Sequence, residues 1–266
     1  MTLPRVLAIG GSDSGGGAGI QADVKTILAS GGFAATAVTA VTAQDTIGVE
    51  AVHAVPPDVV AAQIRLVLAD LGADAVKTGM LGDAAIVGAV ADALAGFTGP
   101  LVVDPVMVAK GGAPLLAPEA VPVLCDRLIA RATVVTPNVP ELEALLDLTI
   151  ADEADLLLAA QELLTLGPQA VLAKGGHLEG AEVADWLVTR DGQRRFASPR
   201  IASRHTHGTG CTLASALATS LAAGRPLEEA VVEARAFVAQ AIHHAPGLGR
   251  GHGPLGHGWP LASTRT

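Results

Sequence analysis

The sequence predicts an α/β protein whose mostly parallel central sheet is covered by helices on both faces. Short apolar runs alternate with longer stretches in which apolar residues recur at helical spacing, the order expected of β–α–β units. The runs are apolar along their whole length, as strands buried on both faces must be. Polar and glycine-rich residues follow them repeatedly, at the strand ends where open α/β sheets bind ligands.

One domain over residues 1–266 is the simplest organisation of the chain. A length of 266 residues fits one large domain or two small ones, so length alone does not decide. The sequence contains no internal repeat, no block of like charges and no Pro/Ser-rich linker that would mark a boundary.

The first half of the chain shows the alternation clearly. A Val/Leu/Ile run ends in glycine at residues 5–11, and apolar residues then recur at helical spacing up to Gly31. Residues 35–44 are rich in β-branched side chains, and Pro57 stands at the start of the next helical pattern. We expect strands at 5–11, 35–44, 74–80 and 99–106, with helices at 20–31, 57–72 and 83–97.

The second half continues the alternation and ends in a Gly/His-rich tail. A helix at 118–130, strands at 132–138 and 169–176 with two helices between them, a hairpin at 183–197 and two final helices are expected. The histidines of the C-terminal region are His243, His244, His252 and His257. Because no cysteine or carboxylate pattern accompanies them, a flexible or partner-facing tail is favoured over a metal site.

Composition narrows the function classes. Half of the residues are hydrophobic and 2% are aromatic, so the core must be aliphatic. The net charge of −9 argues against nucleic-acid binding, which needs clustered Lys and Arg, but leaves small phosphorylated ligands possible. No apolar run reaches the roughly 18 residues of a membrane span.

The two cysteines, Cys125 and Cys211, are too few for a disulfide framework. Glycines interrupt the apolar run near the N-terminus before it reaches the length that an export signal requires. A reducing, cytoplasmic location is therefore expected.

The glycine-rich stretch 10–19 connects the first expected strand to the first helix. It is not a Walker A loop, because no Gly-Lys-Ser/Thr follows, and it lacks a clean dinucleotide fingerprint. It is either a tight turn or a loop whose backbone approaches a small ligand closely. Asp23 lies one helical turn further on, where an aspartate usually faces solvent.

Three charged residues follow strands in the middle of the chain. Asp104 precedes Pro105 at a strand end, where it either takes part in Mg²⁺ or phosphate binding or merely caps a turn. Glu141 begins a helix, where the dipole favours it in any case, but with Asn138 it has the spacing to share a hydrated metal. Lys174 ends an apolar strand before two glycines, where it reaches a phosphate or simply extends to the surface.

The segment Gly208-Thr209-Gly210-Cys211 is the strongest signal in the sequence. The two glycines allow close approach of a ligand, and the helix behind them offers unsatisfied N–H groups and a positive dipole end. This predicts an anion-binding turn, with simple helix capping as the alternative. The helix N-terminus is expected to lower the pKa of the Cys211 thiol toward neutrality.

Together the motifs resemble one known family. The stretches that carry the resemblance are AIGGSDSGGGAGIQAD, TAVTAQDTIGV, DAVKTGML, VVDPVMVAKGG, LLAP, TPNVPE, VLAKGGH, THGTGCTLASALA and APGLGRGHGPLGH, and they cover nearly the whole chain. The chain is similar to the hydroxymethylpyrimidine/phosphomethylpyrimidine kinases of thiamin biosynthesis, which have a ribokinase-like, three-layer α/β/α fold. Two positions depart from the family pattern: Thr78 stands where isoleucine is expected, and His205 stands where asparagine is expected.

The resemblance implies an ATP- and Mg²⁺-dependent kinase, usually a homodimer, that phosphorylates a pyrimidine alcohol and then its monophosphate. Gly11 and Asp23 would belong to the pyrimidine pocket, Gln44 would read the base through its amide, and Met80 and Val106 would form apolar walls. The residues that would face Mg²⁺ and the triphosphate are Asp104, Asn138, Glu141, Lys174 and Thr209.

The role of Cys211 has two interpretations. The wider superfamily, by resemblance, usually has an aspartate base at this position, so a thiolate would take the proton of the substrate hydroxyl. Gly208, Gly210 and Lys174 would then complete the catalytic group by stabilising negative charge. Alternatively, Cys211 only shapes the pocket, because a loose transition state needs no strong base.

Two other functions stay open. A pyridoxal/pyridoxine kinase of the same superfamily would act on a similar heterocycle with a hydroxymethyl group, although Gln44 favours the pyrimidine. A non-catalytic ligand-binding protein on a kinase scaffold is disfavoured by the intact Asp104, Glu141 and Lys174.

Overall fold

A single nine-stranded sheet runs through the described part of the protein. The structure is a computed structural model that describes residues 3–109 and 111–262; Lys110, within one of the family-like motifs, and the last four residues of the tail lie outside this range. The strand order is β3-β2-β1-β4-β5-β6-β7-β8-β9. The strands are β1 (Arg5–Asp13), β2 (Phe33–Gln44), β3 (Val49–Ala54), β4 (Ala75–Thr78), β5 (Leu101–Val103), β6 (Val134–Val135), β7 (Ala170–Lys174), β8 (Glu182–Thr189) and β9 (Gly192–Pro199).

The centre of the sheet is parallel and its two margins are antiparallel. Strands β2, β1, β4, β5, β6 and β7 pair in parallel, whereas β3 pairs antiparallel with β2, and β8 and β9 form an antiparallel hairpin beside β7. The expected mostly parallel sheet is thus confirmed. All the carboxyl ends of the parallel strands consequently lie along one edge.

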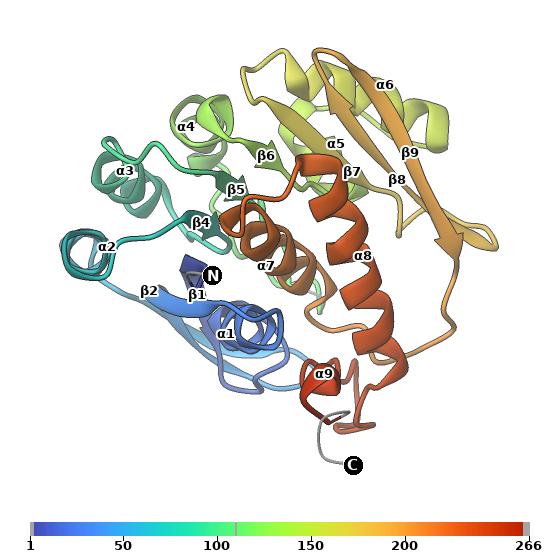
Figure 1. Cartoon of the computed structure of the whole chain (residues 1–266), viewed down its shortest axis with the longest axis horizontal. Coiled ribbons are helices and arrows are strands. Elements are labelled where there is room, and N and C mark those ends of the chain that lie inside the picture. Colours follow the sequence, from blue (N-terminus) through green and yellow to red (C-terminus); the bar gives the residue numbers. More distant parts are fainter. Residues whose placement is uncertain (1–2, 110, 263–266) are drawn as a thin grey trace.

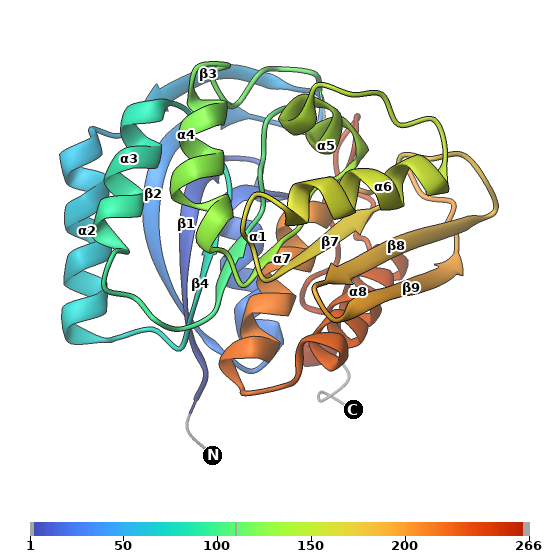
Figure 2. The ribbon, with the colours of Figure 1, turned by 90° about the horizontal axis from the view of Figure 1, so that it is seen from above.

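Helices cover both faces of the sheet (Figures 1 and 2). One face carries α1 (Gly19–Ala29), α7 (Thr209–Ala222) and α8 (Leu227–His243). The other carries α2 (Pro57–Asp70), α3 (Ala84–Ala93), α4 (Ala120–Arg127), α5 (Val139–Leu146) and α6 (Glu153–Leu164). A 3₁₀ turn, η1 (Ile129–Arg131), follows α4, and a short helix, α9 (Trp259–Ala262), follows the tail. No helix in the described ranges is both long and apolar enough to cross a membrane.

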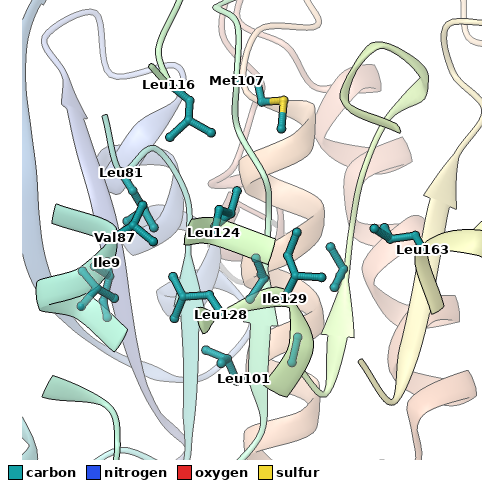
Figure 3. Packing of buried hydrophobic residues seen from close by; sticks show 14 of the residues in the cluster. Ile9, Leu81, Val87, Leu101, Met107, Leu116, Leu124, Leu128, Ile129 and Leu163 are labelled. Atoms are coloured by element: carbon teal, nitrogen blue, oxygen red, sulfur yellow. The ribbon is translucent and has the colours of Figure 1, made fainter. Parts of the chain in front are cut away.

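Alternation along each strand divides the core into two layers. In β1, Leu7 and Ile9 pack toward α2–α6, while Val6 and Ala8 pack toward α1, α7 and α8. Figure 3 shows Ile9 among the leucines and isoleucines of the first layer. Both faces of the central strands are therefore buried, which is why their sequences are apolar without a polar partner face.

Capping residues fix where several helices begin. Asp83 accepts a hydrogen bond from the Ile86 N–H at the start of α3, and Asp152 does the same for α6. At the start of α5, Asn138 and Glu141 form a reciprocal capping box. Helices α3 and α5 each follow a parallel strand, so their caps also hold loops at the carboxyl edge of the sheet.

Two elements were absent from the sequence-based expectation. Strand β3 is short and largely exposed, and it pairs only with β2 at the sheet margin, so it lacks the apolar signature of the other strands. The helix α9 spans one turn and is too short to give a periodic pattern. Conversely, the expected hairpin is confirmed, with each of its strands extended slightly beyond the predicted 183–197.

The expectation of a flexible or partner-facing C-terminal tail does not hold for Gly253, Leu255 and His257, which are buried, whereas His243, His244 and His252 are exposed as expected. Leu255 and His257 are 3% exposed, and the His257 Nε2 atom lies 2.8 Å from the Thr212 hydroxyl in α7. Burial lowers the pKa of His257 to about 4, so this histidine is neutral near pH 7. Glycine density in this segment reflects close packing, as the contacts described further below show.

A buried threonine pair gives a test of the packing. Thr78 and Thr39 are both fully buried, but only the Thr39 hydroxyl has a partner within the described structure, donating to the Met80 carbonyl at 2.6 Å. Thr78→Val should raise the free energy of unfolding by about 1 kcal/mol, because it removes a buried unpaired hydroxyl. Thr39→Val should lower it by about 1 kcal/mol. Urea denaturation of both variants measures whether the free energy of unfolding rises or falls. Destabilisation by Thr78→Val would show that the Thr78 hydroxyl has a hydrogen-bond partner.

Candidate active site

A cavity of about 480 Å³ lies at the carboxyl edge of the parallel strands. It is lined by the loops after β1, β4, β5, β6 and β7 and by the first turn of α7. Every candidate residue from the sequence lines it: Gly11, Asp23, Gln44, Met80, Asp104, Val106, Asn138, Glu141, Lys174, Gly208, Thr209, Gly210 and Cys211. The sheet topology thus brings together residues that are up to 200 positions apart, as Gly11 and Cys211 are.

The first turn of α7 is open to the cavity. Its N-cap, Gly208, has a φ of 88°, and no described side chain caps the helix. A Cβ on Gly208 would overlap the Gly17 carbonyl oxygen, so the residue must be glycine for two reasons. The free N–H groups and the dipole of α7 favour an anion at this end of the cavity.

A lysine and two carboxylates face this turn. The Lys174 Nζ atom lies 3.1 Å from Asp104 Oδ1 and 3.8 Å from Glu141 Oε2. A Cβ on Gly210 would lie 3.4 Å from that same Nζ atom and 3.6 Å from Asp104 Oδ2. The strand ends of β5 and β7, the α5 N-terminus and the α7 turn therefore converge on one small volume.

Burial makes this charged group unusual. Asp104 is 2% and Glu141 7% exposed. Burial, together with the charge of Asp104, raises the pKa of Glu141 to about 7, although Lys174 acts in the opposite direction. Burial opposes the charge of Lys174, but Asp104 and Glu141 outweigh it and raise the pKa of the lysine. The cluster therefore holds two carboxylates against a single ammonium.

The expected sharing of a metal between Asn138 and Glu141 is not what their side chains do in this structure. Asn138 Oδ1 accepts from the Glu141 N–H at 2.9 Å, and Glu141 Oε2 accepts from the Asn138 N–H at 2.7 Å. Over the described ranges, no group of three or more His, Cys, Asp or Glu side chains is placed to hold a metal ion.

The Cys211 thiol does not have the lowered pKa expected of a helix N-terminus. Burial raises its pKa to about 11, and Asp23 and Asp104 add to the increase. Lys77 and the Gly19 N–H act in the opposite direction but do not compensate. The sequence-based expectation failed because the helix dipole was weighed without the desolvation of the thiol.

Asp23 is buried, not solvated as its helical position suggested. It is 1% exposed, and its Oδ1 atom accepts hydrogen bonds from Lys77 Nζ at 2.8 Å and from the Ser215 hydroxyl at 2.7 Å. Burial disfavours the charge of Lys77, but Asp23, Cys211 and Asp104 raise its pKa, so the ammonium persists. Lys77 was not singled out from the sequence, and its place inside an apolar strand was the available signal.

A second polar network lies beside Gln44. Asp13 accepts hydrogen bonds from the Gly15, Gly17 and Ala18 N–H groups and pairs with His207 Nε2 at 2.9 Å. Burial alone would raise the pKa of Asp13, but the bonds from His207 and Ala18 hold it below its usual value. The Gln44 Nε2 atom lies 3.4 Å from His207 Nε2.

Asp13 and His207 were not predicted as site residues. The nitrogen of His207 that faces Asp13 donates to the carboxylate, so it cannot also accept from Gln44. The Gln44 amide N–H groups are therefore available to a ligand. Both residues sit in glycine-rich loops, where the sequence pattern drew attention to the glycines rather than to their polar neighbours.

Apolar groups complete the Gln44 end of the cavity. Met80 and Val106 both line it, as expected, with Met107 and Leu115 beside them. A Cβ on Gly11 would lie 2.8 Å from the Met80 sulfur, so Gly11 leaves room for this side chain. The cavity lining thus includes apolar side chains and the Gln44 amide as well as the charged group beside the α7 turn.

Curated relatives cover almost the whole chain. Hydroxymethylpyrimidine/phosphomethylpyrimidine kinase of Haemophilus influenzae is 47% identical over 260 residues, which is 96% of this chain and 97% of that protein. Thiamine biosynthesis bifunctional protein ThiED of Geobacter sulfurreducens is 51% identical over 258 residues. This chain spans about half of the bifunctional protein, 53% of its length.

Solved structures share the fold, which confirms the ribokinase-like expectation. Phosphomethylpyrimidine kinase of Clostridium difficile superposes with a TM-score of 0.80 at 40% identity, over 90% of this chain and 99% of that one. An ADP complex of Bacillus subtilis pyridoxal kinase superposes with a TM-score of 0.90 at 34% identity, over 97% and 98%. Residues 13–256 match the family described as phosphomethylpyrimidine kinase, and the chain belongs to this family.

Proposed function

We propose that this chain is a kinase that transfers the γ-phosphoryl group of ATP to 4-amino-5-hydroxymethyl-2-methylpyrimidine, and then to the resulting monophosphate. The observation that carries the proposal is the lining of one cavity, which combines apolar side chains and the Gln44 amide with the anion-binding turn of α7. The names and identities of the relatives support the same reaction. Structures of Staphylococcus aureus pyridoxal kinase with ADP and AMP-PCP support ATP as the phosphoryl donor.

At one end, the pyrimidine would lie between apolar walls and the Gln44 side chain. Gly11, Met80 and Val106 line this part, and Asp23 lies at its base with its charge neutralised by Lys77. A carboxamide offers a donor and an acceptor, which match the amino group and ring nitrogen of an aminopyrimidine edge. Gln44 would thereby fix the ring so that the hydroxymethyl group points toward α7.

At the other end, the transferring phosphoryl group would meet the first turn of α7. The Gly208–Cys211 N–H groups and Lys174 can stabilise the negative charge on its oxygens, with Thr209 and Asn138 lining the same region. Because phosphoryl transfer has a loose transition state, positioning and charge stabilisation contribute most of the rate enhancement. The convergence of Lys174 and the α7 turn is suited to that task.

The residues at this end fit Mg²⁺. Glu141 and Asp104 carry more negative charge than Lys174 offsets, and Mg²⁺ in kinases commonly takes one or two protein carboxylates with phosphate and water oxygens. Asp104 and Glu141 would hold the ion. When bound, Mg²⁺ would offset negative charge on the triphosphate.

Cys211 is the proposed acceptor of the substrate hydroxyl proton. It lines the cavity at the start of α7, between the two ends. With its pKa raised to about 11, only a small fraction is thiolate at neutral pH, so the base would act through that fraction. Lys77 and the Gly19 N–H are the groups that stabilise the thiolate.

The proposal further includes a single domain and a cytoplasmic location, as expected from the sequence, and a homodimer, which the family resemblance implies. A dimer has twice the chain mass of 26.6 kDa. Sedimentation velocity measures this mass, and a species at the mass of one chain across the micromolar range would remove the dimer from the proposal.

Pyridoxal phosphorylation is the second candidate, because solved pyridoxal kinases superpose on nearly the whole chain. Wild-type enzyme assayed with ATP should phosphorylate the pyrimidine alcohol with a higher kcat/KM than pyridoxal.

Gln44→Ala should raise KM for the pyrimidine by about 5–150-fold, the equivalent of a lost buried hydrogen bond of about 1–3 kcal/mol. Gln161→Ala, at an exposed glutamine of α6, serves as the control. Unchanged kinetics in Gln44→Ala would remove Gln44 from substrate recognition.

Asp104 and Glu141 are expected to determine the Mg²⁺ concentration that the enzyme needs for half-maximal rate. Glu141→Gln and Asp104→Asn should each raise the Mg²⁺ concentration needed for half-maximal rate and lower kcat, because each removes a negative charge from the cation site. Glu162→Gln, at an exposed glutamate of α6, should behave as wild type. Mg²⁺ titrations of the two site variants that overlay the wild-type curve would make these carboxylates structural.

The thiol predicts a pH dependence. A base acts only when deprotonated, so kcat should rise with pH across the neutral range toward the thiol pKa of about 11. Cys211→Asp should move this rise to lower pH, whereas Cys211→Ala should lose about 10²–10⁴-fold in kcat. Cys125→Ala, at a half-buried cysteine in α4, is the control. If Cys211→Ala keeps near wild-type kcat with an unaltered profile, the thiol only shapes the pocket.

A further inference from the structure

The segment Gly249–His257, called the strap below, has no part in the proposed reaction but touches both ends of the cavity wall. It connects the end of α8 to α9. The sequence favoured a flexible or partner-facing tail here, yet this segment makes hydrogen bonds to three parts of the structure: the turn between β2 and β3, the loop before α7, and α7 itself. These contacts restrain the position of the segments that the strap touches.

The first contact is with the turn between β2 and β3. The Arg250 and Gly251 N–H groups both donate to the Thr46 hydroxyl at 3.2 Å, and the His252 N–H donates to the Thr46 carbonyl at 2.8 Å. A Cβ on Gly249 or Gly251 would overlap Thr46. Thr46 lies two residues after Gln44, so the strap is anchored beside the pyrimidine end.

The second contact is with the loop that leads into α7. The His207 N–H donates to the Gly253 carbonyl at 3.2 Å, and His207 and Pro254 form a parallel bridge. A Cβ on Gly253 would overlap the ring of His205. The residue immediately before the α7 N-cap is thereby tied to the strap.

The third contact reaches the first turn of α7 itself. The Thr212 hydroxyl donates its single hydrogen to the Gly208 carbonyl at 2.8 Å, so His257 Nε2, 2.8 Å from the same oxygen, is the protonated nitrogen and donates to it. His257 and Thr212 are 3% and 0% exposed. A continuous chain of hydrogen bonds thus runs from the strap to the glycine at which the anion-binding turn begins.

We propose that the strap fixes the turn Gly208–Cys211 in the position required for phosphoryl transfer, with His257 as a positioning residue that acts through Thr212. His257 does not line the cavity, so its effect must pass through the helix. This inference rests on the proposed function, because it takes the α7 turn to be the phosphate end. Loss of His257 should therefore affect the chemical step more than pyrimidine binding.

The test compares His257→Ala with a matched variant of the same strap. His257→Ala should lower kcat by about 10–100-fold with KM for the pyrimidine little changed, because a small displacement of a positioned group is costly in rate. His257→Gln, whose amide can take the place of Nε2, should recover most of the loss. His252→Ala removes an exposed histidine of the strap and should behave as wild type.

A second pair of measurements isolates the route through Thr212. Thr212→Val should lower kcat as His257→Ala does, and the double variant should be no worse than the poorer single variant, because the two residues act in one chain. Amide hydrogen exchange across residues 208–212 should be faster in His257→Ala and Thr212→Val than in wild type and His252→Ala. This exchange is measured on the protein without substrate.

The outcomes separate the inference from the proposed function. Absence of wild-type kinase activity on any heterocyclic alcohol would overturn the function, while hydrogen exchange would still report whether the strap orders the turn. Additive losses in the double variant, or exchange at 208–212 unchanged by His257→Ala, would overturn the positioning role. Should His257→Ala not fold, His257→Gln and Thr212→Val carry the same comparison.

Discussion

The site depends on a backbone contact between the two glycine loops. Gly208, at the start of α7, lies against the carbonyl group of Gly17 in the loop after β1, at a distance that no side chain on Gly208 would allow. The same loop is held by Asp13, whose carboxylate accepts its N–H groups and pairs with His207. Because the proposed pyrimidine end is built on the first loop and the proposed phosphate end on the second, this contact sets the spacing between the two loops.

Buried charge follows from the same closeness. Two lysines, Lys77 and Lys174, line the cavity, with Asp23, Asp104 and Glu141 as their carboxylate neighbours. Burying a carboxylate costs free energy of folding unless the carboxylate is paired. Each lysine therefore offsets the negative charge of its neighbours, and its removal would destabilise the fold. The charge is unevenly shared: the Asp23–Lys77 pair is one to one, whereas Lys174 faces two carboxylates. The excess negative charge therefore lies beside the α7 turn, where we propose that Mg²⁺ binds.

The order of strands and helices could be predicted from the sequence, and so could the gathering of polar residues at one edge, since both follow from two-sided burial in parallel sheets. The partners of Asp23 could not, because helical spacing describes the near neighbours of a residue, whereas Lys77 and Ser215 lie far away in the chain. The direction of the Cys211 pKa shift was wrong for a related reason: burial is a tertiary property. In the strap, glycine was compatible with either mobility or tight contact, and only neighbouring segments distinguish the two.

The body of α7 gives the site a dependence on side-chain volume far from any ligand. Residues Thr212 to Ser220 are all buried, and apart from Leu213 and Leu217 they are alanine, serine or threonine. Small side chains let the helix lie close over β1, β4 and β5, and this depth places its N-terminus level with Asp104 and Lys174. A single methyl group added in the middle of α7 would push the whole helix outward. The size of the buried side chains in the middle of α7 thus sets how far its first turn, the proposed phosphate end, extends into the cavity.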